Sequence, residues 1–96
     1  MKIIRTITVL QDTIQNLKSK GKQIGFVPTM GVLHEGHLSL LRRSRRENDI
    51  SVLSIFVNPT QFGPKEDFKK YPRNLRKDKI FANKGKVDIL FLPSAD

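Results

Sequence analysis

Helical spacing of apolar residues marks the first organised segment of the chain, Thr8–Lys20. Its apolar positions fall on one face of a helix: Leu10, Ile14 and Leu17. Thr8 with Gln11 fits a capping box at the start of this segment, and Gly21 supplies a stop at its end. The pattern therefore predicts a helix over these residues.

Three later runs are short and almost continuously apolar, which is typical of strands buried on both faces of a parallel sheet. These runs are Gln23–Val27, which ends at Pro28, Ile50–Val57 and Val87–Leu92. Helical spacing returns between them, from His37 to about Glu47 and from Asn74, a candidate N-cap, to about Lys84. Strands and helices therefore alternate along most of the chain.

Each of these two helices is expected to turn one apolar face inward. In the first, the inward residues are Leu38, Leu40 and Leu41. Its outward residues are mostly arginines: Arg42, Arg43, Arg45 and Arg46. In the second, the apolar face consists of Leu75, Ile80 and Phe81. Both faces would pack against the sheet.

The order of a helix followed by β-α-β-α-β predicts an α/β fold with a Rossmann-like parallel sheet. Three strands make only half of a typical doubly wound fold, so we expect a three-stranded partial unit. We interpret residues 1–96 as the N-terminal part of a longer nucleotide-binding domain, without the second half of that domain or any C-terminal domain.

Composition limits the class of protein. The 96 residues, 38% of them hydrophobic and 28% charged, suit one small globular domain. No run is long enough to span a membrane, and the opening MKIIRTITVL has no small-residue cleavage site, so we expect a cytoplasmic protein without membrane association. The absence of Cys excludes disulfides and thiolate zinc sites.

The net charge of +9 indicates a polyanionic partner, either nucleic acid or the phosphates of a nucleotide. A nucleic-acid-binding module would draw on the cluster Arg42–Arg46. Aromatic residues are poorly interleaved with these arginines, and no known nucleic-acid motif is present. We therefore interpret the cluster as a solvated helix face and expect no nucleic-acid partner, although the alternative stays open.

The strongest candidate for chemistry is the loop PTMGVLHEGH, which follows the first predicted strand and contains both histidines, His34 and His37. Ligands of open parallel sheets bind beyond the carboxyl ends of the strands. Unpartnered N–H groups at the start of the next helix favour an anion there, and two imidazoles add donors. Gly36 would remove a side chain where a purine or a phosphate approaches the backbone. Two ligands of a metal ion are one alternative interpretation, but no third ligand is suitably spaced. Ordinary surface histidines at a helix cap are another.

His-x-Gly-His after a first strand resembles the signature loop of the nucleotidylyl-transferring α/β proteins. Longer strings are more specific. Four segments resemble those of the pantothenate synthetase family, and they occur in the same order and at matching separations. These segments are FVPTMGVLHEGHLSLLRRSR, SIFVNPTQFGPKED, YPRNLRKD and VDILFLPS. The similarity extends from about Ile3 to the last residue. Another nucleotidyltransferase of the same superfamily, with a different acceptor, is the alternative.

The resemblance implies an ATP-dependent ligase that works with Mg²⁺. In the first step the carboxylate of pantoate attacks the α-phosphate of ATP, which gives pantoyl-adenylate and pyrophosphate. In the second step β-alanine displaces AMP to give pantothenate. The family also implies a homodimer for the full-length protein. Because the later substrate contacts of the family lie beyond these residues, we expect no turnover by the 96 residues alone.

The resemblance also assigns roles to individual residues. His34 and His37 match the ATP-phosphate-binding and catalytic histidines, and His37 matches the proton donor. The nucleotide-binding positions are completed by Met30, Gly31 and Gly36. Gln61 matches the glutamine that binds pantoate and lies near β-alanine, and Asn58 and Tyr71 fall on positions that line the site. The ligands of the metal stay unknown.

Overall fold

The computed structural model describes residues 1–56 and 75–93, which form an α/β fold with four strands and three helices. The strands are β1 (Lys2–Ile4), β2 (Ile24–Thr29), β3 (Ile50–Ile55) and β4 (Ile89–Phe91). The helices are α1 (Ile7–Ser19), α2 (Glu35–Glu47) and α3 (Leu75–Lys84). Every helix and strand predicted from the sequence is present, and the α/β class is confirmed.

The sheet has four parallel strands in the order β1-β4-β3-β2, so the expected three-stranded unit is corrected by one strand. The additional strand, β1, has only three residues, one of them Lys2, and is too short to produce an apolar run. It pairs with β4 at the edge of the sheet, where the Lys2 N–H donates to the Asp88 carbonyl at 2.9 Å and the Leu92 N–H donates to the Ile4 carbonyl at 2.8 Å.

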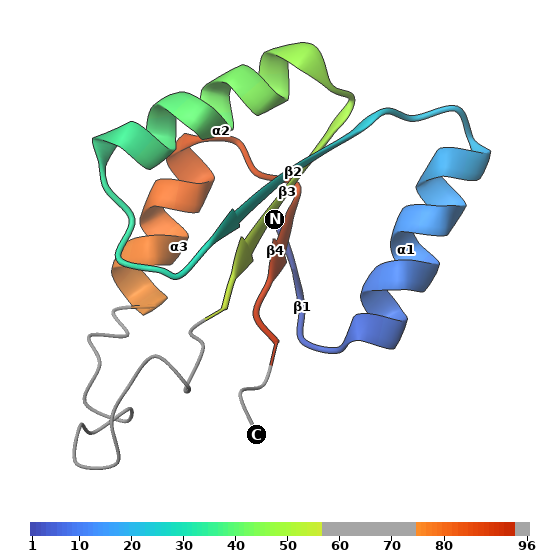
Figure 1. Ribbon diagram of the computed structural model, residues 1–96, viewed down its shortest axis with the longest axis horizontal. Coiled ribbons are helices and arrows are strands. Elements are labelled where there is room, and N and C mark those ends of the chain that lie inside the picture. Colours follow the sequence, from blue (N-terminus) through green and yellow to red (C-terminus); the bar gives the residue numbers. More distant parts are fainter. Residues whose placement is uncertain (57–74, 94–96) are drawn as a thin grey trace.

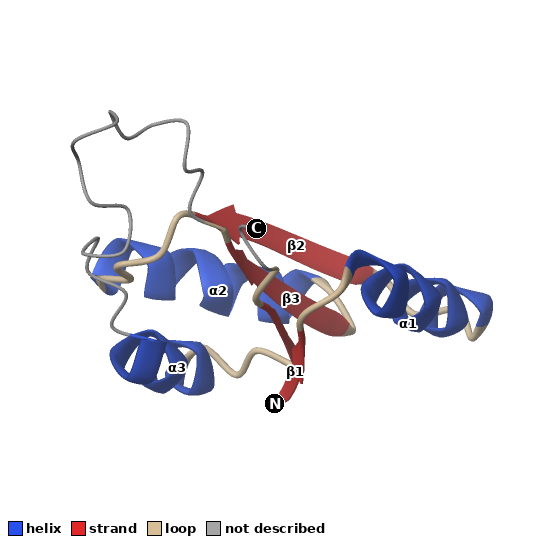
Figure 2. Cartoon of the chain, turned by 90° about the horizontal axis from the view of Figure 1, so that it is seen from below, coloured by secondary structure: helices blue, strands red, loops and turns tan. Residues whose placement is uncertain are grey.

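Helices cover both faces of the sheet. Figures 1 and 2 show α2 and α3 together on one side of the strands and α1 on the other. Alternate residues of the central strands point to opposite faces, as a strand requires. On the α2 and α3 side the core contains Leu53 and Leu90, whereas on the α1 side it contains Val52 and Ile89. This two-sided burial explains the continuous apolar runs of β3 and β4.

The start of α1 differs from the predicted capping box. Thr6, not Thr8, is the N-cap, and its hydroxyl accepts a hydrogen bond from the Val9 N–H at 3.4 Å. The helix stop is confirmed, because Gly21 adopts φ +80° directly after the helix and its N–H bonds the Lys18 carbonyl at 2.9 Å.

The edge strand β2 is less buried than its sequence predicts. It continues through Pro28 to Thr29, which is possible because a proline without an N–H is tolerated on an edge strand. Phe26 is 50% exposed, so the two faces of β2 are not both covered by apolar side chains. Gly25 packs directly under α2, and a Cβ there would lie 2.9 Å from Asn48 Cγ.

Two predicted core positions are wrong. Leu40 and Ile80 are 53% and 50% exposed. The buried positions of α2 are Leu38, Leu41 and Ser44, and those of α3 are Asp78 and Ala82. Small or polar residues, namely Ser44, Asp78 and Ala82, occupy some of these buried positions. Because successive residues are rotated by about 100° around the helix axis, Leu40 and Ile80, one or two positions from a buried residue, point outward.

The arginine-rich face of α2 is partly engaged in local bonds. Arg45 donates to the Asp49 carbonyl and to Asp88 Oδ2, both at 2.8 Å, and Arg43 pairs with Glu47 at 3.0 Å. None of the helices within residues 1–56 and 75–93 combines the length and the apolar character needed to cross a membrane.

Candidate functional site

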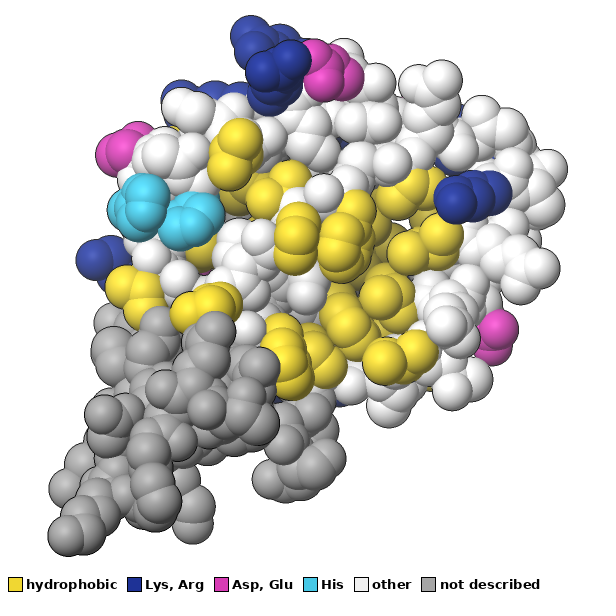
Figure 3. All heavy atoms as spheres, viewed as in Figure 1, with side chains coloured by type: hydrophobic (Ala, Val, Ile, Leu, Met, Phe, Trp, Pro, Cys, Tyr) yellow, Lys and Arg dark blue, Asp and Glu magenta, His cyan; other side chains and the backbone are white. Residues whose placement is uncertain are grey.

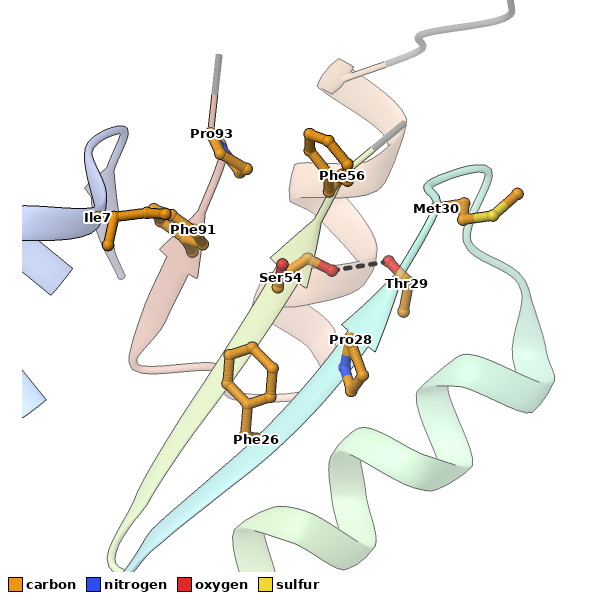
Figure 4. A pocket seen from close by; sticks show the side chains of 9 residues that line it. All are labelled: Ile7, Phe26, Pro28, Thr29, Met30, Ser54, Phe56, Phe91 and Pro93. Carbon is orange, nitrogen blue, oxygen red and sulfur yellow. Dashed lines mark hydrogen bonds between the residues drawn. The ribbon is translucent and has the colours of Figure 1, made fainter. Parts of the chain in front are cut away.

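The candidate site lies where the parallel strands end. Thr29 of β2 links two strands at this edge, because its hydroxyl donates to the Ser54 carbonyl of β3 at 3.0 Å (Figure 4). The same oxygen accepts a weaker bond from the Gly31 N–H at 3.4 Å. The loop that carries the histidines therefore leaves the sheet from a fixed point.

Two consecutive left-handed residues turn the chain from β2 toward α2. Gly31 has φ +95° and Val32 has φ +53°, a conformation that costs a β-branched residue free energy. A Cβ on Gly31 would also lie 3.2 Å from Ile55 Cγ2. Leu33 then enters the core with 3% exposure and anchors the loop. Gly31 is thus needed for the turn itself, a reason independent of any nucleotide.

The two histidines cap α2 together. His34 is the N-cap, and its Nδ1 accepts a hydrogen bond from the Gly36 N–H at 3.1 Å. Nδ1 of His37, in the first turn, accepts from the His34 N–H at 3.2 Å. The two ring centroids lie 4.2 Å apart. The helix therefore begins at Glu35 rather than at His37, and two of the N–H groups expected to be unpartnered are bonded to imidazoles.

This capping fixes the tautomer of both rings. A backbone N–H can only donate, so each Nδ1 must hold a lone pair and the proton of each neutral ring must reside on Nε2. Protonation would occur on Nδ1 and would break the cap. Burial lowers the pKa of His37, the neighbouring His34 lowers it further, and Asp78 acts to raise it. The geometry thus favours a neutral His37 that offers a fixed Nε2–H donor.

Gly36 has a structural role that the sequence did not reveal. A Cβ at this position would lie 2.9 Å from Cε1 and 3.2 Å from Nδ1 of the His34 ring. The space that we expected a purine or a phosphate to occupy is filled by His34 itself. The glycine between the histidines therefore allows the first imidazole to fold back onto the helix.

An apolar pocket of about 560 Å³ lies beside the histidine loop. Figure 3 shows hydrophobic side chains gathered on this face, with the two histidines at its rim. The lining residues, drawn in Figure 4, are Ile7, Phe26, Pro28, Thr29, Met30, Ser54, Phe56, Phe91 and Pro93. Met30 belongs both to the pocket and to the loop. The aromatic members were missed because they come from separate segments of the chain.

The structure brings together the predicted nucleotide-binding positions and leaves the predicted pantoate-binding positions untested. Met30, Gly31, Gly36 and the two histidines share one loop and helix start. Asn58, Gln61 and Tyr71 lie outside the described residues. Within residues 1–56 and 75–93 there is no group of three or more His, Cys, Asp or Glu side chains that could hold a metal ion.

Comparison with known proteins decides the family. The sequence pattern of the family described as pantoate-beta-alanine ligase matches residues 2–96. The chain belongs to this family. The resemblance seen in the histidine loop and in the segments after it is therefore confirmed.

Similar proteins carry the corresponding name. The chain is 55% identical over 96 residues to a pantothenate synthetase of Bacillus cytotoxicus and 56% identical over 96 residues to one of Thermotoga petrophila. Each alignment covers 100% of this chain and 34% of the relative. The chain thus spans about a third of the length of these relatives.

Solved structures of the family share the fold. Pantothenate synthetase from Thermus thermophilus matches with a TM-score of 0.72 and 45% identity over 98% of this chain and 32% of that chain. Pantoate-beta-alanine ligase from Francisella tularensis, solved in complex with beta-gamma ATP and beta-alanine, matches with a TM-score of 0.82 and 45% identity, over 99% of this chain and 36% of that chain. The Rossmann-like assignment is confirmed.

Proposed function

We propose that the chain forms the ATP- and pantoate-binding part of a ligase that condenses pantoate with β-alanine. The reaction passes through pantoyl-adenylate and releases pyrophosphate and then AMP. One observation carries the proposal: two imidazoles with their protons held on Nε2 cap α2 beside an apolar pocket, in a chain of the pantoate-beta-alanine ligase family.

The first chemical step needs donors rather than a base. A carboxylate is already ionised at neutral pH, so pantoate can attack phosphorus without losing a proton. Negative charge then grows on the phosphate oxygens, where positioned N–H donors stabilise it. The Nε2–H groups of His34 and His37 are such donors. In this proposal a neutral His37 hydrogen-bonds to the phosphate and keeps its proton, which differs from the proton transfer that the resemblance implies.

The apolar pocket suits the carbon skeleton of pantoate, which bears two methyl groups. Phe26, Phe56 and Phe91 supply apolar surface, and Met30 places this surface next to the histidine loop. In this arrangement the carboxylate of pantoate would face the α-phosphate. By resemblance to the family, Gln61 binds the pantoate hydroxyl and carboxylate and lies near β-alanine, while Asn58 and Tyr71 line the same site.

Mg²⁺ belongs to the proposal as the companion of ATP. It usually retains several waters and binds through substrate phosphates with one or two carboxylates, so it needs no protein cage. This fits a site whose described residues include no acidic cluster. When bound, Mg²⁺ would neutralise phosphate charge. The side chains of this chain would hold and orient the triphosphate.

The remaining features of the proposal concern the whole protein. Residues 1–96 would form the N-terminal part of the nucleotide-binding domain of a cytoplasmic homodimer. Nucleic acid and membranes would not be partners, and the bonds of Arg43 and Arg45 to neighbouring groups support the first of these exclusions. The site is then partial, and we expect no pantothenate from these 96 residues alone. Mass-spectrometric detection of pantothenate made by contaminant-free chain would contradict this.

Calorimetric titration with Mg²⁺-ATP and with pantoate, separately and together, tests the binding function. We expect ATP to bind and the His37→Ala variant to bind at least tenfold more weakly, since a hydrogen bond to a charged group is worth about 1.5–3 kcal/mol. Arg46→Ala, an exposed change on the same helix, serves as the control and should bind ATP normally. Salt-dependent binding of random DNA that Arg46→Ala weakens, without ATP binding, would instead support the nucleic-acid alternative.

A further inference from the structure

Asp78 of α3 is a buried carboxylate that the proposed reaction does not use. Only 2% of it is exposed, although the cost of removing a charge from water keeps most aspartates at the surface. Its Oδ1 accepts a hydrogen bond from the Leu33 N–H at 2.9 Å. This bond joins positions 45 residues apart and connects α3 to the loop that carries the histidines.

The loop is shaped to meet this carboxylate. Gly31 and Val32 both have positive φ, and the N–H group that follows them is the one bonded to Asp78. A Cβ on Gly31 would lie 3.5 Å from Asp78 Oδ2, so the carboxylate also lies directly against the turn. A charged acceptor for a buried N–H offsets the cost of the left-handed Val32.

The helix that carries Asp78 is itself fixed against α2. Gly85, directly after α3, lies so close to Leu41 that a Cβ there would be 2.7 Å from Leu41 Cβ. Ala82, one turn along α3 from Asp78, is completely buried. The carboxylate is therefore held on a rigid support beneath the histidine loop.

We propose that Asp78 is a positioning residue, which holds the turn Gly31–Leu33 so that His34 and His37 present their Nε2–H donors together. It acts through the Leu33 N–H and not by contact with substrate. The part of this inference that concerns nucleotide affinity rests on the proposed function. The part that concerns the loop does not.

The carboxylate has a second, electrostatic effect on the site. Burial and the neighbouring His34 lower the pKa of the His37 ring, whereas Asp78 acts to raise it. Removing the charge while keeping an oxygen acceptor should therefore lower the pKa of His37 and leave the turn in place. A lower pKa of His37 in Asp78→Asn, with the turn still in place, is a change that a purely structural role would not produce.

NMR spectroscopy of the intact chain separates the two effects. In Asp78→Ala, amide exchange of Leu33 should accelerate by about tenfold or more, while that of Leu53 in the core stays unchanged. ATP affinity should fall by a similar factor. In Asp78→Asn, exchange of Leu33 should stay within about threefold of the unaltered chain, because the amide oxygen can still accept, and the pKa of His37 should fall. The control is Asp12→Asn, an exposed aspartate on α1, which should change none of these readings.

The inference would be overturned if folded Asp78→Ala kept both the Leu33 amide exchange rate and the ATP affinity of the unaltered chain. It would also be overturned if amide exchange in Asp78→Ala accelerated equally at Leu33 and Leu53. If Asp78→Ala does not fold, Asp78→Asn decides the matter: an unchanged pKa of His37, or a loss of Leu33 protection, contradicts the inference. Absence of ATP binding in the unaltered chain would refute the proposed function, while the Leu33 and His37 readings would still test the role of Asp78.

Discussion

The two faces of the sheet meet the candidate site in different ways. On the α2 and α3 side, side chains such as Leu41 and Leu53 are completely buried, and the histidine loop is held by specific hydrogen bonds. On the α1 side, the pocket is lined mostly by apolar side chains, of which Phe26 is 50% and Phe56 is 40% exposed. In the proposed function, recognition of charge would therefore use the more buried face, and recognition of apolar groups would use the more exposed one.

The largest effect should come from the more buried face. Leu41→Ala removes a completely buried side chain from between α2, α3 and the sheet, and we expect it to lower the free energy of unfolding by about 2–5 kcal/mol. Chemical denaturation followed by circular dichroism measures this loss. A loss below about 1 kcal/mol would mean that this face is not the more tightly packed one that we describe.

Phe26→Ala is the matched deletion on the pocket side. Because half of the ring is already exposed, we expect a loss of only about 1 kcal/mol in the same denaturation experiment. Pantoate affinity should fall while ATP affinity stays within about twofold, since the ring lies in the apolar pocket and the proposed phosphate donors lie on the histidine loop. Equal loss of both affinities would contradict the division between the two faces.

The contrast between the faces also explains how much the sequence could predict. Continuous apolar runs identified β3 and β4 because both strands are buried on both faces. A similar run located β2, although this strand lies at the edge of the sheet and Phe26 is 50% exposed. The strand β1 was missed because three residues that include Lys2 form no pattern. Leu40 and Ile80 were placed inward because spacing alone cannot reveal that Ser44 and Asp78 occupy the buried stripes.

The candidate site was predictable in position but not in geometry. The histidines and glycines that follow the first predicted strand, now β2, indicated that the loop lies at the carboxyl ends of the strands. Ring orientation depends on backbone angles at Gly31 and Val32 and on a carboxylate 45 residues away from Leu33, and neither can be read from local spacing. The pocket was missed because its residues converge from four separate segments of the chain.

A smaller effect should follow from a methyl group at the helix start. Gly36→Ala places a Cβ against the His34 ring, which can swing away, so stability should change by less than about 1 kcal/mol. The imidazole would lose its bond to the backbone, and ATP affinity should fall several-fold. Calorimetry and denaturation together check this result. A large loss of stability with normal ATP binding would show that the ring serves only the fold.

The smallest effect concerns pH. Because the pKa of His37 in the folded chain lies below its ordinary value of 6.5, the unfolded chain binds more protons just below that pH. The contribution of His37 to stability is therefore complete above pH 6.5 and is lost as the pH falls toward the folded-state pKa. His37→Gln keeps an acceptor at the same capping position without titrating, so the variant should show a shallower decline of melting temperature between about pH 7.5 and 5. Identical profiles would contradict the capping role.

The state of the two imidazoles tests the central claim most directly. Two-bond ¹H–¹⁵N correlation spectra at about pH 7.5, above the ordinary histidine pKa, report which ring nitrogen carries the proton. Our account predicts neutral rings with the proton on Nε2 in both His34 and His37, and a shift of both Nε2 signals when Mg²⁺-ATP is added. A proton on Nδ1, a cationic His37, or Nε2 signals indifferent to saturating ATP would contradict it.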